Sequence, residues 1–161
     1  MKVENRHQRE LTLNISEAHL LIDNLASKGD IFWPRENWPA MKFDGGLKKG
    51  ANGGHGPIRY KITEYTPGRY IRFHFTAPHG FYGYHALNLV EIDKSRVKLS
   101  HEIIMKIGGP ARLTWPLIFR PLHDALLEDA LTKAARYAGM NPQSVPWSFW
   151  VRFLRYLFKK G

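Results

Sequence analysis

The sequence predicts an α+β protein in which antiparallel strands are followed by one long C-terminal helix and by an amphipathic tail helix. Three observations predict it. Residues 57–107 form four successive runs that alternate between apolar and polar side chains, with short turns between them. In residues 111–138 the apolar residues change to helical spacing. Residues 147–159 repeat helical spacing with many aromatic and several basic side chains.

Composition limits the classes of protein that the chain can represent. Its 161 residues are 43% hydrophobic, which suffices for one domain with a core. The chain contains no cysteine, and this excludes disulfides, thiolate metal ligands and a cysteine nucleophile. It shows no signal peptide and no run of the roughly 18 to 20 apolar residues needed to span a bilayer, so we expect a cytoplasmic protein. It also has no nucleic-acid-binding motif, so no nucleic-acid partner is expected.

The first predicted elements are a strand over residues 5–15 and a helix over residues 17–27. Ser16 is the expected N-cap of this helix, and Gly29 would end it. Residues 30–56 contain two Trp-Pro pairs and several glycines, which predict loops and turns with one strand around residues 41–47. The glycines of residues 50–56 lack the strand-to-helix context of a phosphate-binding loop, so we expect them to serve turns.

Two hairpins are predicted next. Residues 57–65 and 70–77 are strands joined at a Pro-Gly turn, and residues 81–93 and 96–107 are strands joined by a polar turn. If Thr66 faces Arg69, each residue of the first strand has a definite partner: Glu64 faces Ile71, Ile62 faces Phe73 and Tyr60 faces Phe75. A three-residue loop in the second hairpin gives a second set of pairs, His85 with Met105, Leu87 with Ile103 and Leu89 with His101. Both hairpins then present an apolar face to a common core.

The long helix is predicted within residues 111–138. An apolar stripe runs from Leu122 to Ala138, and Gly139 ends the pattern. Pro116 and Pro121 predict a break or kink before about residue 120, because proline removes a backbone donor and clashes with the preceding turn.

This order of elements, together with the segments "WPAMKF", "GPIRYKITEYTPGRYIRF" and "ALTKAARYAG", resembles the START-like, helix-grip superfamily (SRPBCC). That superfamily includes the polyketide cyclase/dehydrase-like and the coenzyme Q-binding-like proteins. The resemblance covers residues 5–139 and implies a curved sheet wrapped around the long helix, with a cavity between them that binds lipids, polyketides, sterols or quinones in relatives. We therefore expect a START-like domain over residues 1–139, followed by a linker and tail over residues 140–161.

The inward face of the predicted sheet combines aromatic and aliphatic side chains with a few polar ones, which suits a pocket for a small hydrophobic ligand. The residues expected to bind this ligand are Tyr60, Glu64, Phe73, Phe75, His85, Leu87, Leu89, His101, Ile103 and Met105. The alternative is that these residues fill an ordinary core. Each unsatisfied polar group would then cost roughly 1 to 3 kcal/mol, which favours a solvated or ligand-filled cavity.

No catalytic signature is present, so the choice between a binding protein and an enzyme stays open. For an enzyme of the cyclase/dehydrase kind, the candidates for general acid or base are Glu64, His85, His101 and His123. The predicted register separates His85 from His101 by four residues, or about 13 Å, so they are not expected to share an ion. No spacing of the HExxH type occurs either, and we expect no metal and no cofactor.

The basic character is concentrated toward the C-terminal end, because no acidic residue follows Asp129 and six basic residues do: Lys133, Arg136, Arg152, Arg155, Lys159 and Lys160. A helix over residues 147–159 is too short to span a bilayer but suits the membrane interface. Its expected contact residues are Trp147, Trp150, Arg152, Leu154, Arg155, Leu157, Phe158 and Lys159. Three partners remain open for this tail: an anionic surface on the inner face of the membrane, its own domain, or a second subunit of a homodimer. A non-catalytic interaction module that acts through the tail is a further alternative.

Overall fold

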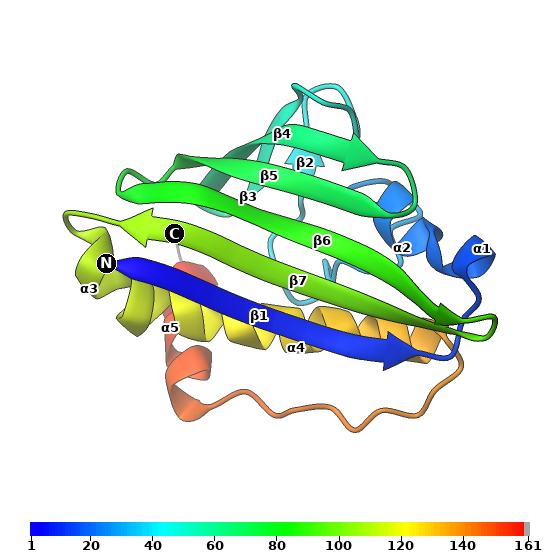
Figure 1. Cartoon of the computed structure of the whole chain (residues 1–161). Coiled ribbons are helices and arrows are strands. Elements are labelled where there is room, and N and C mark those ends of the chain that lie inside the picture. The colour runs from blue at the N-terminus through cyan, green and yellow to red at the C-terminus, as the bar shows by residue number, and fades with distance from the viewer. Residues whose placement is uncertain (160–161) are drawn as a thin grey trace.

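The computed structural model of the chain describes residues 1–159 and confirms the α+β class. Its seven strands form one antiparallel sheet in the order β1-β7-β6-β5-β4-β3-β2. Figure 1 shows that this sheet curves around one side of the long helix. The strands are β1 (Lys2–Leu11), β2 (Lys42–Phe43), β3 (Asn52–His55), β4 (Ile58–Thr66), β5 (Tyr70–Ala77), β6 (Phe81–Asp93) and β7 (Arg96–Ile107).

The helical elements lie before the second strand and after the last one. They are α1 (Ile15–Ala18), α2 (Leu20–Asp23), α3 (Ala111–Thr114), the π-helical turn η1 (Trp115–Phe119), α4 (Arg120–Tyr137) and α5 (Phe149–Lys159). The elements α3, η1 and α4 follow one another without a gap, and the irregular turn contains Pro116. The predicted break before residue 120 is therefore confirmed.

The first helix differs from the prediction in where it begins, in its continuity, and in where it ends, which is at Asp23 and not at Ser27. Asn14, not Ser16, is the N-cap, because its side chain accepts a hydrogen bond from Glu17 N while the Glu17 side chain accepts one from Asn14 N. The helix is also divided at His19 into α1 and α2. In the glycine-rich segment, residues 52–55 form β3 and do not serve turns alone.

The first hairpin confirms two predicted pairs and corrects the rest. Ile62 pairs with Phe73 and Tyr60 with Phe75, as expected. Between Ile62 and Glu64 the register shifts, because Thr63 is an extra residue on β4 that forms a β-bulge. Beyond the bulge every side chain of β4 therefore changes face. The predicted pairing of Glu64 with Ile71 is wrong.

The second hairpin is displaced by two residues from the predicted register. The turn is the two-residue pair Lys94-Ser95, and a further irregularity lies between Glu91 and Asp93. His85 consequently pairs with Ile103, and Leu87 pairs with His101. Because side chains alternate with a period of two, the inward-facing set is unchanged while its neighbours across the strands are different.

The core between the sheet and the helices consists of two clusters of buried apolar side chains. The larger cluster includes Tyr60, Phe73 and Leu87, and it receives Leu127 and Leu131 from α4. The smaller cluster lies toward α3 and η1, and its residues are Val3, Phe75, Phe81, Ile103, Met105, Ile107, Ala111 and Trp115. The boundary between the two clusters positions the candidate site.

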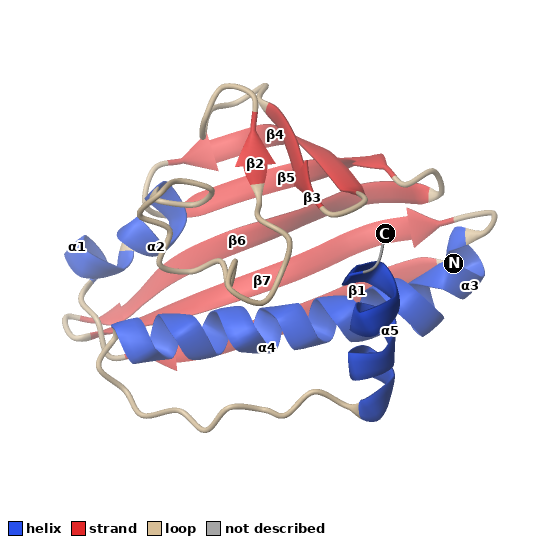
Figure 2. Cartoon of the chain, turned by 180° about the vertical axis from the view of Figure 1, so that it is seen from behind, coloured by secondary structure: helices blue, strands red, loops and turns tan. Residues whose placement is uncertain are grey.

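The tail returns along the long helix. Residues 140–148 run as an extended segment back along α4, and α5 then packs across it (Figure 2). Gly139 ends α4 in the left-handed conformation, and Met140 N donates a hydrogen bond to Ala135 O. Among the described residues, no helix combines the length and the apolar character required to cross a membrane.

Candidate functional site

Four histidines form a continuous row across the interior of the domain, which we call the histidine row: His85, His101, His123 and His7. His85 and His101 are 5% and 6% exposed, and His85 Nδ1 lies 3.2 Å from His101 Nε2. The ring of His101 is 5.0 Å from that of His123, which is 5.7 Å from that of His7. The predicted separation of about 13 Å between His85 and His101 is therefore wrong. The two-residue difference in register makes them diagonal neighbours on adjacent strands.

The histidine row lies at the boundary between the two apolar clusters. The ring of His85 stacks on Phe73 at 4.7 Å and lies 4.8 Å from Tyr60, both in the larger cluster. On its other side it lies 5.1 Å from Phe75, which belongs to the smaller cluster. Polar rings thus separate two aromatic regions of the core.

Several nitrogens of the histidine row have no hydrogen-bond partner. Within residues 1–158, the buried side-chain polar atoms without a partner are Asn5 Oδ1, His85 Nε2, His101 Nδ1, His123 Nδ1 and His123 Nε2. All of them belong to the row or lie two residues from His7. Burial lowers the pKa of His85 and of His101 well below the usual value, so both imidazoles are neutral. Each neutral ring offers one N–H donor and one lone pair.

Nine of the ten predicted ligand-binding residues are buried in the interior, and one is not. Leu87 and Leu89 belong to the larger cluster, whereas Ile103 and Met105 belong to the smaller one. Glu64 is the exception and a correction. The bulge at Thr63 turns its side chain to the outer face, where it is 50% exposed and forms an ion pair with Arg72.

The outer end of the histidine row is a polar contact between β1 and α4 that the sequence analysis missed. His7 Nε2 lies 3.0 Å from Asp124 Oδ1, and His7 Nδ1 lies 3.2 Å from Glu128 Oε1. Asn5 donates to Asp124, and Arg9 donates to Glu128. The residue spacing in the sequence could have predicted this contact. Residues 5, 7 and 9 share one face of a strand, and residues 124 and 128 share one face of a helix.

The two carboxylates at this end determine the charge of His7. The hydrogen bond to Asp124 raises the pKa of His7 more than partial burial lowers it, and Glu128 raises it further. His7 therefore differs from the interior histidines, whose pKa values are lowered by burial.

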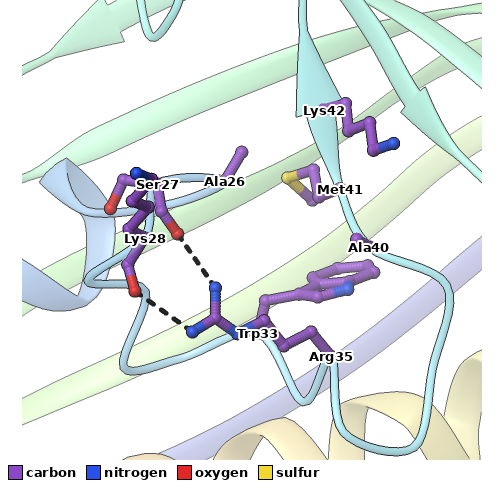
Figure 3. Close-up of a pocket in the computed structure, with 8 residues that line it drawn as sticks. All are labelled: Ala26, Ser27, Lys28, Trp33, Arg35, Ala40, Met41 and Lys42. Atoms are coloured by element: carbon purple, nitrogen blue, oxygen red, sulfur yellow. Dashed lines mark hydrogen bonds between the residues drawn. The ribbon is translucent and has the colours of Figure 1, made fainter.

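Two surface pockets lie beside α2, away from the histidine row. The first has a volume of about 190 Å³ and is lined by Trp33, Arg35 and Met41 among others (Figure 3). The second has a volume of about 390 Å³ and shares Ala26 and Ser27 with the first. Neither pocket is lined by a residue that the sequence predicts to bind the ligand.

A chain of rings connects the first pocket with the histidine row. Trp33 lines the pocket and packs against His55, with 4.7 Å between the ring centroids. His55 Nδ1 in turn lies 3.1 Å from the hydroxyl of Tyr60, whose ring contacts His85. The pocket and the interior imidazoles are thus joined through three side chains.

One face of α5 packs on its own domain. Val151 and Leu154 are buried, and Trp147 Nε1 donates to Asp129 Oδ2 at 3.0 Å. The same oxygen accepts from Trp38 Nε1 at 2.7 Å. The guanidinium of Arg155 lies over the rings of both tryptophans, at 4.3 and 4.4 Å. These contacts hold the tail helix against α4 and the loop that contains Trp38.

The opposite face of α5 is exposed and, apart from Arg152, aromatic or aliphatic. It consists of Phe149, Arg152, Phe153, Tyr156 and Leu157, spaced i, i+3, i+4, i+7 and i+8, and Phe149 is 77% exposed. Trp150 Nε1 donates to Leu117 O, which places α5 beside the exposed Leu117 and Leu113. The side chain of Lys159 and the whole of Lys160 lie outside the described residues.

Comparisons with known proteins reveal a shared fold. No family model matches the chain, and no curated protein matches it in sequence. A protein from Thermobifida fusca, solved by NMR, superposes with a TM-score of 0.66 over 88% of this chain and 99% of its own, at 13% identity.

Two further solved structures agree with this result. Norcoclaurine synthase from Thalictrum flavum, in complex with dopamine and hydroxybenzaldehyde, gives a TM-score of 0.63 at 11% identity over 89% of this chain and 90% of its own. CalU16 from Micromonospora echinospora gives a TM-score of 0.59 at 14% identity, over 99% of this chain and 93% of its own. At such low identity the similarity shows the fold alone.

Proposed function

Because the chain has the START-like, helix-grip fold, we propose that it binds a small hydrophobic ligand between the sheet and α4, with the ligand's polar group bonded to the histidine row. The observation that carries this proposal is the set of buried imidazole nitrogens without partners inside an aromatic interior. Each unsatisfied polar group costs about 1 to 3 kcal/mol, and a ligand that supplies a donor or acceptor offsets that cost.

The two apolar clusters supply contacts for the rest of such a ligand. A molecule at the boundary touches Phe73 and Leu87 on one side and Phe75 and Ile103 on the other. The proposed binding residues are Tyr60, Phe73, Phe75, His85, Leu87, Leu89, His101, Ile103 and Met105. Admission of the ligand requires the clusters to move apart. The π-helical turn η1 lies over the smaller cluster, and such irregular turns are frequent at functional sites.

The chemistry of the site favours an aromatic or quinone-like ligand that carries a hydroxyl or carbonyl group. Neutral imidazoles accept from a hydroxyl or donate to a carbonyl, and the surrounding rings of Phe73 and Phe75 stack on an aromatic body. Norcoclaurine synthase holds molecules of this size and type in its structure. Lipids and polyketides combine the same features in larger molecules.

The experiment is native mass spectrometry of protein purified from its own cells, followed by solvent extraction and identification of the retained compound. We expect one compound per chain in the wild type and in the Glu64→Gln control, whose substitution lies on the outer face. We expect its loss in His101→Leu, which replaces the polar ring by an apolar side chain. An undiminished compound in His101→Leu contradicts the proposal, as does an empty wild type that binds neither hydroxybenzaldehyde nor a quinone.

We propose an enzyme of the cyclase/dehydrase kind as a second candidate, because the unpartnered nitrogens of the buried imidazoles are available for proton transfer with a bound substrate. His85, His101 and His123 are its proposed catalytic residues. The retained compound distinguishes the two functions. If the wild type converts it to a different compound, either an isomer or a product that has lost water, while His101→Gln binds it unchanged, the chain is an enzyme.

We further propose that the exposed face of α5 binds an anionic membrane surface. Aromatic side chains at headgroup level and nearby arginines are typical of interfacial helices. Leu113 and Leu117 extend the apolar face beyond α5, and the exposed Arg112, Arg120 and Arg152 lie on α3, at the start of α4 and on α5. The positive charge of these arginines favours a membrane that contains anionic lipid over a hydrophobic partner protein without acidic residues.

Vesicle flotation tests this second proposal. We expect the wild type to float with vesicles of phosphatidylcholine and phosphatidylglycerol, and much less with phosphatidylcholine alone. The double variant Phe149→Ser/Phe153→Ser should lose at least about tenfold in partitioning, since two large aromatic side chains no longer enter the interface. Tyr82→Ser, which removes an exposed aromatic residue from β6, is the control. If the wild type is instead a dimer that the double variant dissociates, the face is a subunit contact and the membrane proposal is wrong.

A further inference from the structure

Three potential metal ligands meet where β1 lies against α4, at the outer end of the histidine row. They are His7 from β1 and the neighbouring residues His123 and Asp124 from α4. One ligand atom of each lies within 4.8 Å of the ligand atoms of the other two. We propose that these three side chains bind a divalent transition-metal ion such as Zn²⁺.

The distances fit the coordination sphere of such an ion. Zinc binds imidazole nitrogen and carboxylate oxygen at about 2.0 to 2.2 Å, so two ligands of a tetrahedral ion lie about 3.3 to 3.5 Å apart. Here His7 Nε2 is 3.0 Å from Asp124 Oδ1, and His123 Nδ1 is 3.5 Å from the same oxygen. Small side-chain adjustments therefore suffice to place one ion among the three groups.

His123 supplies an independent argument for a ligand at this place. Both of its ring nitrogens are buried and make no hydrogen bond among the described residues, and the nearest acidic oxygen is Asp124 Oδ1, 3.5 Å from Nδ1. Its side chain is only 17% exposed, so solvent does not replace those partners freely. A metal ion satisfies a lone pair of this ring without requiring another protein donor.

The residues around the three ligands resemble the supporting shell of metal sites in general. Metal-binding histidines usually place their second nitrogen against a carboxylate, which fixes the ring and its tautomer. His7 Nδ1 lies 3.2 Å from Glu128 Oε1, and Glu128 is held in turn by Arg9 at 3.0 Å. Asn5 Nδ2 donates to Asp124 Oδ1 at 2.8 Å. The ligands are therefore oriented by groups outside the proposed coordination sphere.

Charge and access are compatible with an ion at this place. The carboxylates of Asp124 and Glu128 offset the arginines nearby, and Arg120 Nε lies 3.6 Å from the other oxygen of Asp124. Arg120 is largely exposed and is free to turn toward solvent when a cation binds. Asp124 and Glu128 are partly exposed, so an ion reaches the site without opening the core.

The ligand set also predicts selectivity. Two imidazoles and one carboxylate suit Zn²⁺, Co²⁺ and Fe²⁺, which accept nitrogen ligands readily. Mg²⁺ and Ca²⁺ prefer oxygen ligands. With three protein ligands, the fourth position of a tetrahedral ion stays open to water or to a small molecule. The site shares His123 with the histidine row, where the ring of His123 lies 5.0 Å from that of His101, but Zn²⁺ titration tests it without the proposed hydrophobic ligand.

The test is isothermal titration calorimetry of full-length, tag-free protein with ZnCl₂ and CoCl₂, with MgCl₂ and CaCl₂ as comparison ions. Absorption spectra are recorded during the CoCl₂ titration. We expect one Zn²⁺ per chain, visible absorption bands on Co²⁺ binding, and no binding of Mg²⁺. His123→Asn and Asp124→Asn should weaken Zn²⁺ binding at least about 100-fold. Glu128→Gln should weaken it by about 10- to 100-fold, the usual effect of removing a supporting carboxylate. The control is His19→Ala, which removes a second His-Asp pair, 3.1 Å from Asp23, at a distant place.

Several results would overturn the proposal. These are the absence of stoichiometric Zn²⁺ binding by the wild type, retention of full affinity in a folded His123→Asn variant, and an equal loss in His19→Ala. Circular dichroism and thermal unfolding establish that each variant is folded. If the ligand variants do not fold, histidine NMR resonances of the wild type during a Zn²⁺ titration locate the ion directly. Shifts confined to His7 and His123 support the site, and shifts elsewhere contradict it.

Discussion

His85 shows how the protonation of a single buried residue makes the stability of the folded protein depend on pH. Its ring is 5% exposed and is enclosed by Phe73, Phe75 and Tyr60, so burial holds its pKa well below the usual value of 6.5. In the unfolded chain the same ring is solvated and gains a proton below pH 6.5. The unfolded state therefore binds more protons than the folded state under acidic conditions, and stability falls with the pH.

We predict that the wild type loses about 1.4 kcal/mol of its free energy of unfolding through His85 alone between pH 7.5 and pH 5.5. His85→Leu removes this contribution. Between pH 7.5 and pH 5.5, the free energy of unfolding of the variant should therefore fall by about 1.4 kcal/mol less than that of the wild type. Urea unfolding at both pH values, in the presence of a chelator, measures the difference. Equal losses in wild type and variant would show that His85 is protonated in the folded protein.

Asp129 connects two elements that are distant in sequence. Its Oδ2 accepts from Trp38 in the loop before β2 and from Trp147 at the start of the tail. Arg155 of α5 covers both indole rings. The attachment of α5 thus depends on one carboxylate, one guanidinium and two indoles, in addition to the burial of Val151 and Leu154.

We predict that Asp129→Ala destabilises the protein by about 2 kcal/mol, because the buried indole N–H of Trp38 loses its acceptor. The tail should also become susceptible to proteolysis within residues 140–148. Urea unfolding and limited digestion measure the two effects. The control is Glu36→Ala, which breaks an exposed ion pair with Lys133 and should change stability by less than about 1 kcal/mol. A tail that stays protected in Asp129→Ala would mean that apolar burial alone holds α5.

The elements could be predicted from sequence more accurately than their registers. Alternation defined β4 to β7, and Pro116 marked the irregular turn before α4. The bulge at Thr63 left no such mark, since one extra residue does not change the composition of a strand, and Glu64 was assigned to the wrong face for this reason. The two-residue turn after Asp93 and the irregularity between Glu91 and Asp93 together moved His101 next to His85. Nine of the ten residues assigned to the inward face are buried, whereas the contacts among the histidines were not predicted, and a role of these residues in ligand binding stays a prediction.

At the scale of the whole molecule, we predict a division of the chain into residues 1–139 and a tail, whose helix α5 packs on α4. This division stays a prediction. Met140 N donates to Ala135 O, so a fragment of residues 1–140 retains the hydrogen bonds that end α4. The fragment loses the burial of Val151 and Leu154 and one of the two donors to Asp129.

We predict that the fragment of residues 1–140 folds cooperatively and is less stable than the full chain by about 3 to 6 kcal/mol, the upper estimate for burial of two aliphatic side chains. Urea unfolding followed by circular dichroism measures this difference. A peptide of residues 141–161 added in excess should restore part of the loss. A fragment without a cooperative transition would show that the tail is an integral part of the domain.

The pairing of β1 with β7 has a consequence for how the protein is made. β1 is synthesised well before its partner strand, which begins at Arg96, and the contacts of His7 with Asp124 and Glu128 span 117 and 121 residues. During synthesis β1 therefore stays unpaired until β7 has emerged. Contacts of such long sequence separation slow folding, because a large loop must close before they form. The step that completes the sheet also assembles the outer end of the histidine row, so a nascent chain cannot hold an ion there before it has folded.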